Sequence, residues 1–253
     1  MKAAIVTGVS KGLGESIAKL YLESGVMVIG ISRTDNKNLY SIAENNNTEF
    51  HHVACDLSDL SEYDSALNKV DEILFQDQVE LGTIYLVNNA GIVDPIDQAK
   101  NITNDTLQKH LQVNTFAPMA FTNYYLKKAE ERQVTLITAI VTSGAAKKPK
   151  FGWSAYCSSK ASMNMYTETV ALEQDEEQTG NQIIAFSPGV MDTNMQETIR
   201  SSSKEAFKDV EDFKGLKDNN LLKDTDLIAG VLIDIMTDEK IQNGKIYDVK
   251  DYI

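Results

Sequence analysis

Tyr156 and Lys160 are the residues of this chain whose types and spacing point most directly to chemistry. They lie one turn apart in a segment with a helical pattern, so both side chains emerge on the same face. A free tyrosine has a pKa of about 10. An ammonium group ~4 Å away is worth about 4 kcal/mol at an effective dielectric near ~20, or roughly three pKa units. We therefore expect Lys160 to lower the pKa of Tyr156 toward neutrality and make it an acid–base catalyst.

A glycine-rich segment near the N-terminus suggests a second capacity, the binding of a diphosphate. Residues 7–14 (TGVSKGLG) follow a short apolar run and lead directly into a helical pattern. Gly8 permits a tight turn, Gly12 lets the backbone approach the phosphates, and Gly14 allows close packing of helix and sheet. Free N–H groups and the positive end of the helix dipole would then face the anion. This order of strand, loop and helix predicts a dinucleotide site.

The residues after the second predicted strand indicate which dinucleotide is preferred. An acidic residue at this point accepts hydrogen bonds from the 2′-hydroxyl of NAD and repels a 2′-phosphate. This chain has Ser32 and Arg33 there, and the first carboxylate after the strand is Asp35. Arg33 offers a planar fork that matches phosphate, and Lys11 adds a second positive charge. We therefore expect NADP(H) as the cofactor; the alternative is that both cations are ordinary surface residues.

Segments with strand character alternate with amphipathic helical patterns along the whole chain. Segments 83–88 and 134–142 lack polar alternation, as expected for strands that are covered on both faces. The alternation predicts one α/β domain over residues 1–253, a Rossmann fold with a doubly wound parallel sheet and right-handed crossovers. The predicted strands are about 3–7, 26–31, 50–55, 83–88, 134–142, 182–187 and 245–249, and the predicted helices about 12–24, 37–45, 58–76, 103–129, 153–178 and 224–237.

Residues 189–223 form a connection far longer than the usual few residues between a strand and a helix. Met191, Met195 and Ile199 lie at helical spacing within it. We expect one short amphipathic helix that acts as a lid, rather than a flexible tail.

The composition argues against several other classes of protein. A net charge of −13 argues against nucleic acid, whose phosphates favour a basic surface. The chain shows neither a membrane-span pattern nor a signal peptide, so we expect a cytoplasmic protein with no membrane partner. Cys55 and Cys157 lack a CxxC spacing, as in a reduced protein. His51, His52 and His110 lack metal-ligand spacing, so we expect no metal and only structural or surface roles for them.

An ordered set of motifs resembles the short-chain dehydrogenase/reductase family over essentially the whole chain. A tyrosine and a lysine at this spacing often occur by chance, but the ordered set is specific. The resemblance implies an oxidoreductase in which hydride from a nicotinamide reduces a small-molecule carbonyl while Tyr156 donates a proton. The matching pieces are residues 7–14, Asn88-Asn89-Ala90-Gly91, Asn114, Ser143, Tyr156-Cys157-Ser158-Ser159-Lys160 and Pro188-Gly189.

The resemblance gives roles to two further residues. Ser143 would hydrogen-bond the carbonyl oxygen of the substrate and stabilise the charge that develops there. Pro118 has no N–H, so the helical hydrogen bond to the carbonyl of Asn114 cannot form. In the family, the equivalent carbonyl holds a water that extends a proton relay from the lysine to solvent. The alternative is that Pro118 only kinks the helix. The expected catalytic residues are Ser143, Tyr156, Lys160 and Asn114.

The resemblance also implies how the cofactor is held. Asn89 would touch the adenosine ribose, Asp56 and Leu57 the adenine, and residues 188–193 the nicotinamide. The expected cofactor-binding residues are Gly8, Ser10, Lys11, Gly12, Leu13, Gly14, Ser32, Arg33, Asp56, Leu57, Asn89, Ala90, Gly91, Tyr156, Lys160, Pro188, Gly189, Val190 and Thr193.

The expected substrate pocket is apolar, aromatic and rich in methionine. Aromatic rings suit flat substrates, and methionines adapt to varied shapes. The alternative is that some of these side chains only pack the lid onto the sheet. The expected pocket residues are Ala145, Phe151, Trp153, Met191 and Met195.

Longer runs resemble one branch of the family, the bacterial benzil reductases that form (S)-benzoin, which are similar to sepiapterin reductases. These runs are 152–160, 186–193 and 199–204. The resemblance implies NADPH-dependent reduction of an aromatic or vicinal dicarbonyl compound. The alternatives are a sepiapterin-type or 3-oxoacyl reductase in the same fold, or a binding module that senses NADP(H) without turnover. Family members often pair through their two long helices, here 103–129 and 153–178, so we expect a homodimer.

Overall fold

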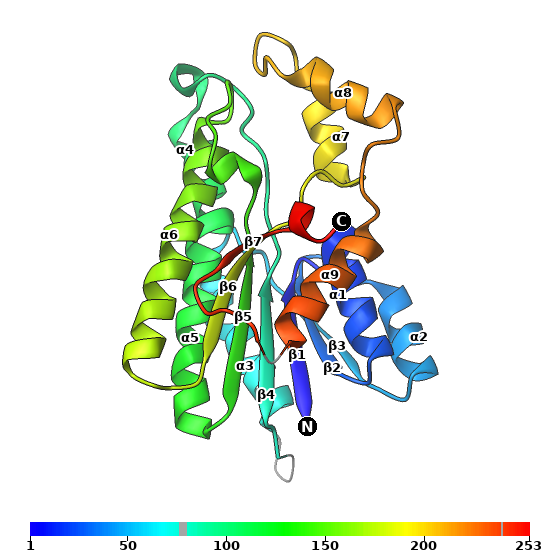
Figure 1. Ribbon diagram of the computed structural model, residues 1–253, viewed down its shortest axis with the longest axis vertical. Helices are drawn as coiled ribbons and strands as arrows, with labels where there is room; N and C mark the ends of the chain where they lie inside the picture. The colour runs from blue at the N-terminus through cyan, green and yellow to red at the C-terminus, as the bar shows by residue number, and fades with distance from the viewer. Residues whose placement is uncertain (76–79, 239) are drawn as a thin grey trace.

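A seven-stranded parallel sheet forms the centre of the molecule (Figure 1). The computed structural model describes residues 1–75, 80–238 and 240–253. The strand order is β3-β2-β1-β4-β5-β6-β7, so the chain builds outward from β1 in one direction, returns, and builds outward in the other. The predicted doubly wound α/β fold is therefore confirmed. The strands are β1 (Lys2–Thr7), β2 (Met27–Ser32), β3 (Phe50–Ala54), β4 (Thr83–Asn88), β5 (Thr135–Val141), β6 (Gln182–Ser187) and β7 (Ile246–Asp248).

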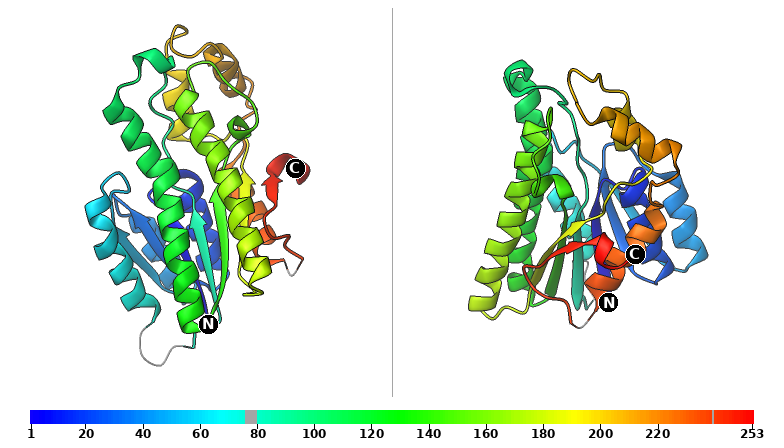
Figure 2. Two further views of the ribbon diagram at one scale, coloured as in Figure 1. Left: turned by 90° about the vertical axis from the view of Figure 1, so that its left-hand side faces the viewer. Right: turned by 45° about the horizontal axis from the view of Figure 1, so that its top comes forward.

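Helices cover both faces of the sheet, which explains the near-continuous apolar runs of the strands. Figures 1 and 2 show α1, α2 and α9 on one face and α3, α5 and α6 on the other. Side chains alternate along each strand, so each face has its own apolar core. The covering helices are α1 (Gly12–Glu23), α2 (Lys37–Asn45), α3 (Tyr63–Leu74), α5 (Ala117–Arg132), α6 (Ser154–Glu176) and α9 (Thr225–Thr237), and short 3₁₀ turns lie at Leu60–Glu62, Ala99–Asn101, Gly144–Ala146 and Val249–Asp251.

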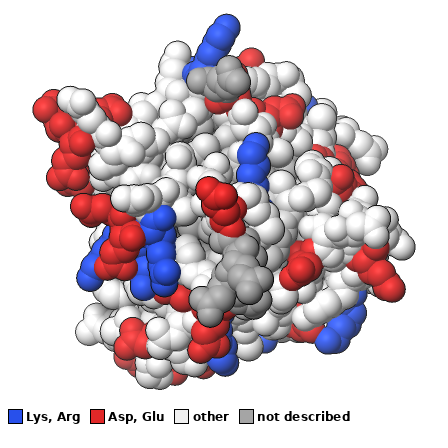
Figure 3. Space-filling view, turned by 90° about the horizontal axis from the view of Figure 1, so that it is seen from below, with Lys and Arg blue, Asp and Glu red and all other residues white. Residues whose placement is uncertain are grey.

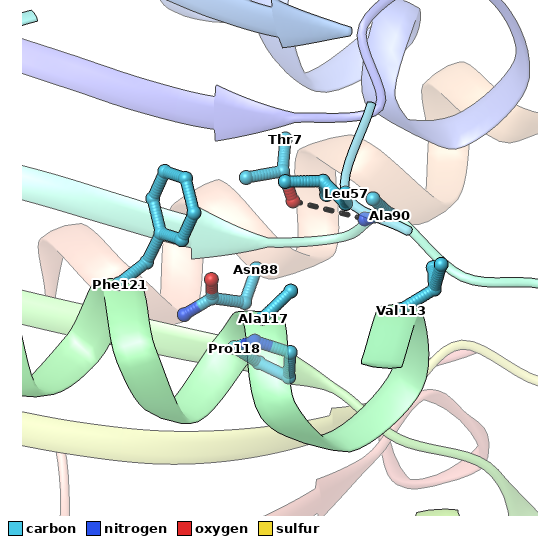
Figure 4. A pocket seen from close by; sticks show the side chains of 8 residues that line it. All are labelled: Thr7, Leu57, Asn88, Ala90, Val113, Ala117, Pro118 and Phe121. Atoms are coloured by element: carbon cyan, nitrogen blue, oxygen red, sulfur yellow. Dashed lines mark hydrogen bonds between the residues drawn. The ribbon is translucent and has the colours of Figure 1, made fainter. Parts of the chain in front are cut away.

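The strand order reverses between β1 and β4, and ligands of such sheets bind at the carboxyl ends of the strands at this point. The Thr7 hydroxyl accepts hydrogen bonds from the backbone N–H groups of Asn89 and Ala90, both at 3.0 Å. Beneath this junction, side chains from β1, β4 and α5 surround a narrow internal gap with no room for a water molecule (Figure 4). The hydrogen bonds to the Thr7 hydroxyl hold the ends of β1 and β4 together.

The expected continuous helix over 103–129 is interrupted. It consists of α4 (Asn104–Leu111), a π-helical turn at Gln112–Phe116, and α5. Pro118 lies in the first turn of α5, where its missing N–H is tolerated. The π-helical turn contains Asn114, and such turns occur frequently at functional sites.

The connection after β6 contains two helices where one was expected. They are α7 (Asn194–Arg200) and α8 (Val210–Asp218), which pack together above the carboxyl ends of the strands (Figure 1). Met191 lies before α7, so only Met195 and Ile199 of the three regularly spaced residues lie on this helix. Elsewhere, the expected helix 58–76 begins as a 3₁₀ turn followed by α3, and residue 76 lies outside the described residues.

The surface reflects the negative charge of the chain. On the face at the amino-terminal ends of the strands, acidic side chains are spread widely and basic side chains lie among them (Figure 3). In the part of the chain that the structure describes, no helix is long and apolar enough to cross a membrane.

Candidate functional site

The glycine-rich loop has the geometry that a diphosphate site needs. Gly8 and Gly12 have φ angles of +78° and +62°, which side chains rarely tolerate. A Cβ on Gly14 would lie 2.2 Å from the carbonyl oxygen of Gly8, so the start of α1 packs directly on the loop. No side chain caps the N-terminus of α1, so its N–H groups are available to an anion.

The loop contacts segments from distant parts of the sequence. Asn36 caps α2 and donates to the carbonyls of Val9 and Ser10, both at 3.4 Å. On the other side, Thr193 from the segment after β6 lies 3.4 Å from the position of a Cβ on Gly12. The structure thus brings together the expected diphosphate segment and the expected nicotinamide segment.

Charged side chains gather where β2 and β3 end. Arg33 is two-thirds exposed, and its Nη1 lies 3.9 Å from Oδ2 of Asp56. Asp35 forms an ion pair with Lys37, and this hydrogen bond lowers the pKa of the Asp35 carboxyl. Ser32 is buried and donates its hydroxyl hydrogen to the carbonyl of Thr34 at 2.8 Å. Arg33 thus presents an exposed guanidinium beside Asp56, while the nearby carboxylate Asp35 has the exposed Lys37 as its cationic partner.

Tyr156 and Lys160 both lie on α6 and are both buried. The Lys160 ammonium donates to the carbonyl of Val141 at 2.8 Å and lies 5.7 Å from the centroid of the Tyr156 ring. The Tyr156 hydroxyl lies 4.0 Å from Sδ of Met195, on the lid. Ser143 follows β5 and accepts a hydrogen bond from the backbone N–H of Ala145 at 3.1 Å.

The expected lowering of the Tyr156 pKa is wrong. Burial raises the pKa of Tyr156 to about 12, and the side chain of Ser143 opposes this increase only in part. Burial also lowers the pKa of Lys160 to about 8. The reason is that Lys160 turns to the Val141 carbonyl, so desolvation dominates both groups. Tyr156 consequently holds its proton at neutral pH.

The Asn114 side chain fixes the backbone after the motif 88–91. Its Nδ2 donates to the carbonyl of Ile92 at 2.7 Å, and its Oδ1 accepts from the N–H of Ile92 at 2.8 Å. A Cβ on Gly91 would lie 3.4 Å from Oδ1 of Asn114 and 3.7 Å from the Lys160 ammonium. Because Gly91 has no side chain, the Asn114 side chain and the Lys160 ammonium can both approach the position that a Cβ would occupy.

An apolar cluster surrounds the Tyr156 ring. Trp153 packs edge-on against Tyr156 at 5.1 Å between ring centroids and stacks on Phe207 at 4.7 Å. Phe213 of α8 contacts both Trp153 and Phe207. Ala145 and Met195 belong to the same cluster. Its members thus come from the loop after β5, from α6 and from the lid.

Two of the expected pocket residues lie apart from this cluster. Phe151 is exposed beneath the ammonium of Lys208, 5.3 Å from the ring centroid. Met191 packs against the core on the α1 and α9 side of the sheet. Both had been placed by sequence proximity to Tyr156 and to the lid, which does not fix the direction of a side chain.

Comparison with known proteins shows to which family the chain belongs. Residues 2–204 match the family model described as short chain dehydrogenase. The chain belongs to the short chain dehydrogenase family. Its relatives include "Benzil reductase ((S)-benzoin forming)" of Bacillus subtilis (strain 168), which is 39% identical with full coverage of both chains. The Bacillus cereus protein of the same name is 36% identical over 99% of this chain and 100% of its own.

Solved structures show the same fold. A short chain dehydrogenase/reductase from Saccharomyces cerevisiae superimposes with a TM-score of 0.83 and 26% identity, covering 100% of this chain and 97% of its own. As a member of the short chain dehydrogenase family, the protein is an oxidoreductase that acts on C=O or CH–OH groups with NAD(P)(H).

Sequence reasoning missed Phe207 and Phe213, which lie beyond the expected lid helix and to which no motif pointed. His110, for which a structural or surface role was expected, is fully buried 3.0 Å from Nδ2 of Asn114, as the structural alternative requires. The contact with Asn114 was not predicted, and its position one turn before Asn114 was the available signal.

Proposed function

We propose that this chain is an NADPH-dependent reductase of aromatic or vicinal dicarbonyl compounds, of the type that converts benzil to (S)-benzoin. The observation that carries the proposal is a tyrosine that holds its proton within an aromatic, apolar cluster, in a chain similar over its full length to two benzil reductases. A flat diketone offers rings for the cluster and a carbonyl oxygen for the hydroxyl.

The glycine loop fits a dinucleotide diphosphate, because Gly8, Gly12 and the uncapped start of α1 leave a cradle lined by backbone N–H groups. Arg33 supports the choice of NADP(H), since it is exposed at the end of β2. Asn89, Lys160 and residues 188–193 would hold the remainder of the cofactor. The bound nicotinamide supplies the hydride.

The residues of the chain then supply the proton and hold the reacting oxygen. In reduction, the carbonyl carbon gains a hydride and its oxygen gains the proton of the Tyr156 hydroxyl, which converts C=O into CH–OH. Ser143 donates to the same oxygen as negative charge develops on it. The Lys160 ammonium lies 5.7 Å from the ring centroid of the residue that has given up its proton, and the Asn114 carbonyl takes part in returning a proton from solvent.

One contact disfavours a pterin substrate. An acidic group near the pocket could anchor the guanidine-like edge of a pterin, and Asp192 is the candidate carboxylate. Lys217 of α8 binds this carboxylate at 2.6 Å. A diketone needs no such anion, so the site suits an uncharged substrate better.

The test follows NADPH consumption with benzil, 1-phenyl-1,2-propanedione, sepiapterin and a 3-oxoacyl thioester. We expect turnover with the two diketones and an (S)-configured product from benzil. Activity with the thioester or sepiapterin alone would replace the diketone assignment. Tight NADPH binding without oxidation by any of the four would identify a sensor.

We further propose that the protein forms a homodimer through the face of α6. Met165 and Leu172 lie two turns apart on this helix and are each about 60% exposed. Of the small residues in α6, Ala171 is buried within its own chain, so Ala161 and Ser162 would face the second copy. Light scattering on the wild type and on Met165→Glu tests this: a dimer that becomes a monomer supports it, and a wild-type monomer contradicts it.

A further inference from the structure

His110 lies at the centre of a buried hydrogen-bond network next to the reaction site. Its Nδ1 lies 2.6 Å from the carbonyl oxygen of Asp94, and its Nε2 lies 3.0 Å from both Nδ2 of Asn114 and Oγ of Ser159. The side chain is fully buried, and its ring lies edge-on to Tyr156 at 6.2 Å between centroids.

The partners of the imidazole determine which nitrogen carries its proton. The orientation of the Asn114 amide is fixed, because Ile92 offers one N–H to its oxygen and one carbonyl to its nitrogen. Nδ2 of Asn114 is therefore a donor, and Nε2 of His110 must accept from it. The Asp94 carbonyl can only accept, so Nδ1 must carry the hydrogen. The network thus selects a neutral imidazole with its proton on Nδ1.

The same imidazole connects the elements that carry the expected catalytic residues. The Ser159 hydroxyl lies 2.9 Å from the carbonyl oxygen of Tyr156 and 3.0 Å from Nε2 of His110, and its single hydrogen can point to either acceptor. His110 belongs to α4, Ser159 to α6, and Asn114 to the π-helical turn. One ring therefore contacts the helix of Tyr156, the residue that fixes Ile92, and the loop at Asp94.

We propose that His110 is a positioning residue of the active site, and that as a neutral imidazole it fixes Asn114 relative to Tyr156. The inference rests on the proposed catalytic roles of Tyr156 and Asn114. Small misplacements of reacting groups are costly, about 100-fold in rate for a shift of ~1 Å. Loss of the contact to Asn114 lowers kcat, whereas the glycine loop and its hold on NADPH are unaffected.

The proposal includes a pH dependence. A proton on Nε2 would face the N–H of Asn114, so protonation breaks that contact. The charged and titratable groups around the ring are Lys160 and Tyr156 on α6 and Asp94 in the loop after β4. Burial and the positive charge of Lys160 lower the pKa of His110 below its usual 6.5. The rate is therefore expected to fall only at acidic pH, as His110 becomes charged.

A pair of variants separates positioning from bulk packing. His110→Phe keeps a ring without polar atoms, and His110→Gln keeps an acceptor near the position of Nε2. With benzil and NADPH, we expect roughly 10–100-fold loss of kcat in His110→Phe, little change in the KM for NADPH, and substantial rescue in His110→Gln. The acidic decline of the wild-type rate should be absent from His110→Gln. Equal activity of all three proteins, or equal loss in both variants, would overturn the proposal.

A measurement on the unmodified protein covers the case in which a variant does not fold. Nitrogen-15 NMR of the histidine rings should show His110 protonated on Nδ1 at neutral pH; protonation on Nε2 would contradict the network. This readout does not depend on turnover. Wild-type protein that shows the expected tautomer but reduces no carbonyl would refute the proposed function while leaving the hydrogen-bond assignment intact.

Discussion

The two ends of the candidate cofactor site use charge in opposite ways. At the end near Tyr156, the titratable groups are buried and desolvation dominates their pKa values. At the end near Arg33, the cations reach into solvent, and Lys37 next to Asp35 is more than four-fifths exposed. Burial can change the reactivity of a group by several pKa units, whereas exposed charges are screened. The difference fits the proposed roles, in which the first end carries the reactivity and the second sets the cofactor preference.

Tyr156→Phe should have the largest effect, because it removes the proposed proton donor from the buried end. We expect kcat to fall by about 10²–10⁴-fold, the usual contribution of a positioned general acid. The affinity for NADPH, measured by fluorescence titration, should change little. Parallel loss of turnover and cofactor affinity would show that the hydroxyl acts in binding, and the two ends would then not differ as described.

Arg33→Asp tests the exposed end. A hydrogen bond to a charged group is worth about 1.5–3 kcal/mol, and roughly 1.4 kcal/mol corresponds to tenfold. We therefore expect the ratio of kcat/KM for NADPH to that for NADH to fall by about 10–100-fold, mostly through KM. Arg33→Lys serves as the control, since it keeps the charge and should lose less. An unchanged ratio in Arg33→Asp would refute the assignment of Arg33 to the 2′-phosphate.

The lowered pKa of Lys160 predicts a pH dependence of stability. Its folded pKa of about 8 lies below the ordinary lysine value of 10.5, so between these values the unfolded chain binds more protons. Stability contributed by this group therefore rises with pH across that interval. Compared with Lys160→Met, the wild type should gain unfolding free energy from pH 8 to pH 10.5, as measured by urea denaturation. A constant difference between the two proteins would mean that Lys160 is not desolvated.

The sequence predicted the overall fold better than the buried end of the site. Strand positions and the left-handed backbone at Gly8 depend on local patterns, which the sequence carries directly. The pKa of Tyr156 was predicted from Lys160 alone. It is set by burial under the lid and by the turn of Lys160 toward Val141. These contacts join segments far apart in the chain.

His110 illustrates the same limit within one helix. Its spacing from Asn114 is visible in the sequence, but its burial and its contact with Ser159 depend on the packing of α4 against α6. The lid shows the same limit of sequence-based prediction over a longer stretch of the chain, because Phe207 and Phe213 join the Tyr156 cluster only through the fold of α7 and α8. Local periodicity indicates an element, whereas the partners of its side chains require the tertiary structure.

The smallest effect is expected for Lys37→Ala, which removes the cationic partner of Asp35. The contact with Lys37 is the main cause of the lowered pKa of Asp35. Without it this pKa moves back toward the ordinary acidic value, so the carboxylate stays ionised at neutral pH and its negative charge has lost the Lys37 partner. Exposed ion pairs are worth about 0.2–1 kcal/mol, so NADPH affinity should fall by no more than about fivefold, with NADH affinity nearly constant. The loss should shrink at high salt. Asp35→Asn in the same background should restore NADPH affinity, because it removes the charge that Lys37 had balanced. If the double variant binds NADPH as weakly as Lys37→Ala alone, then Lys37 acts on the cofactor directly.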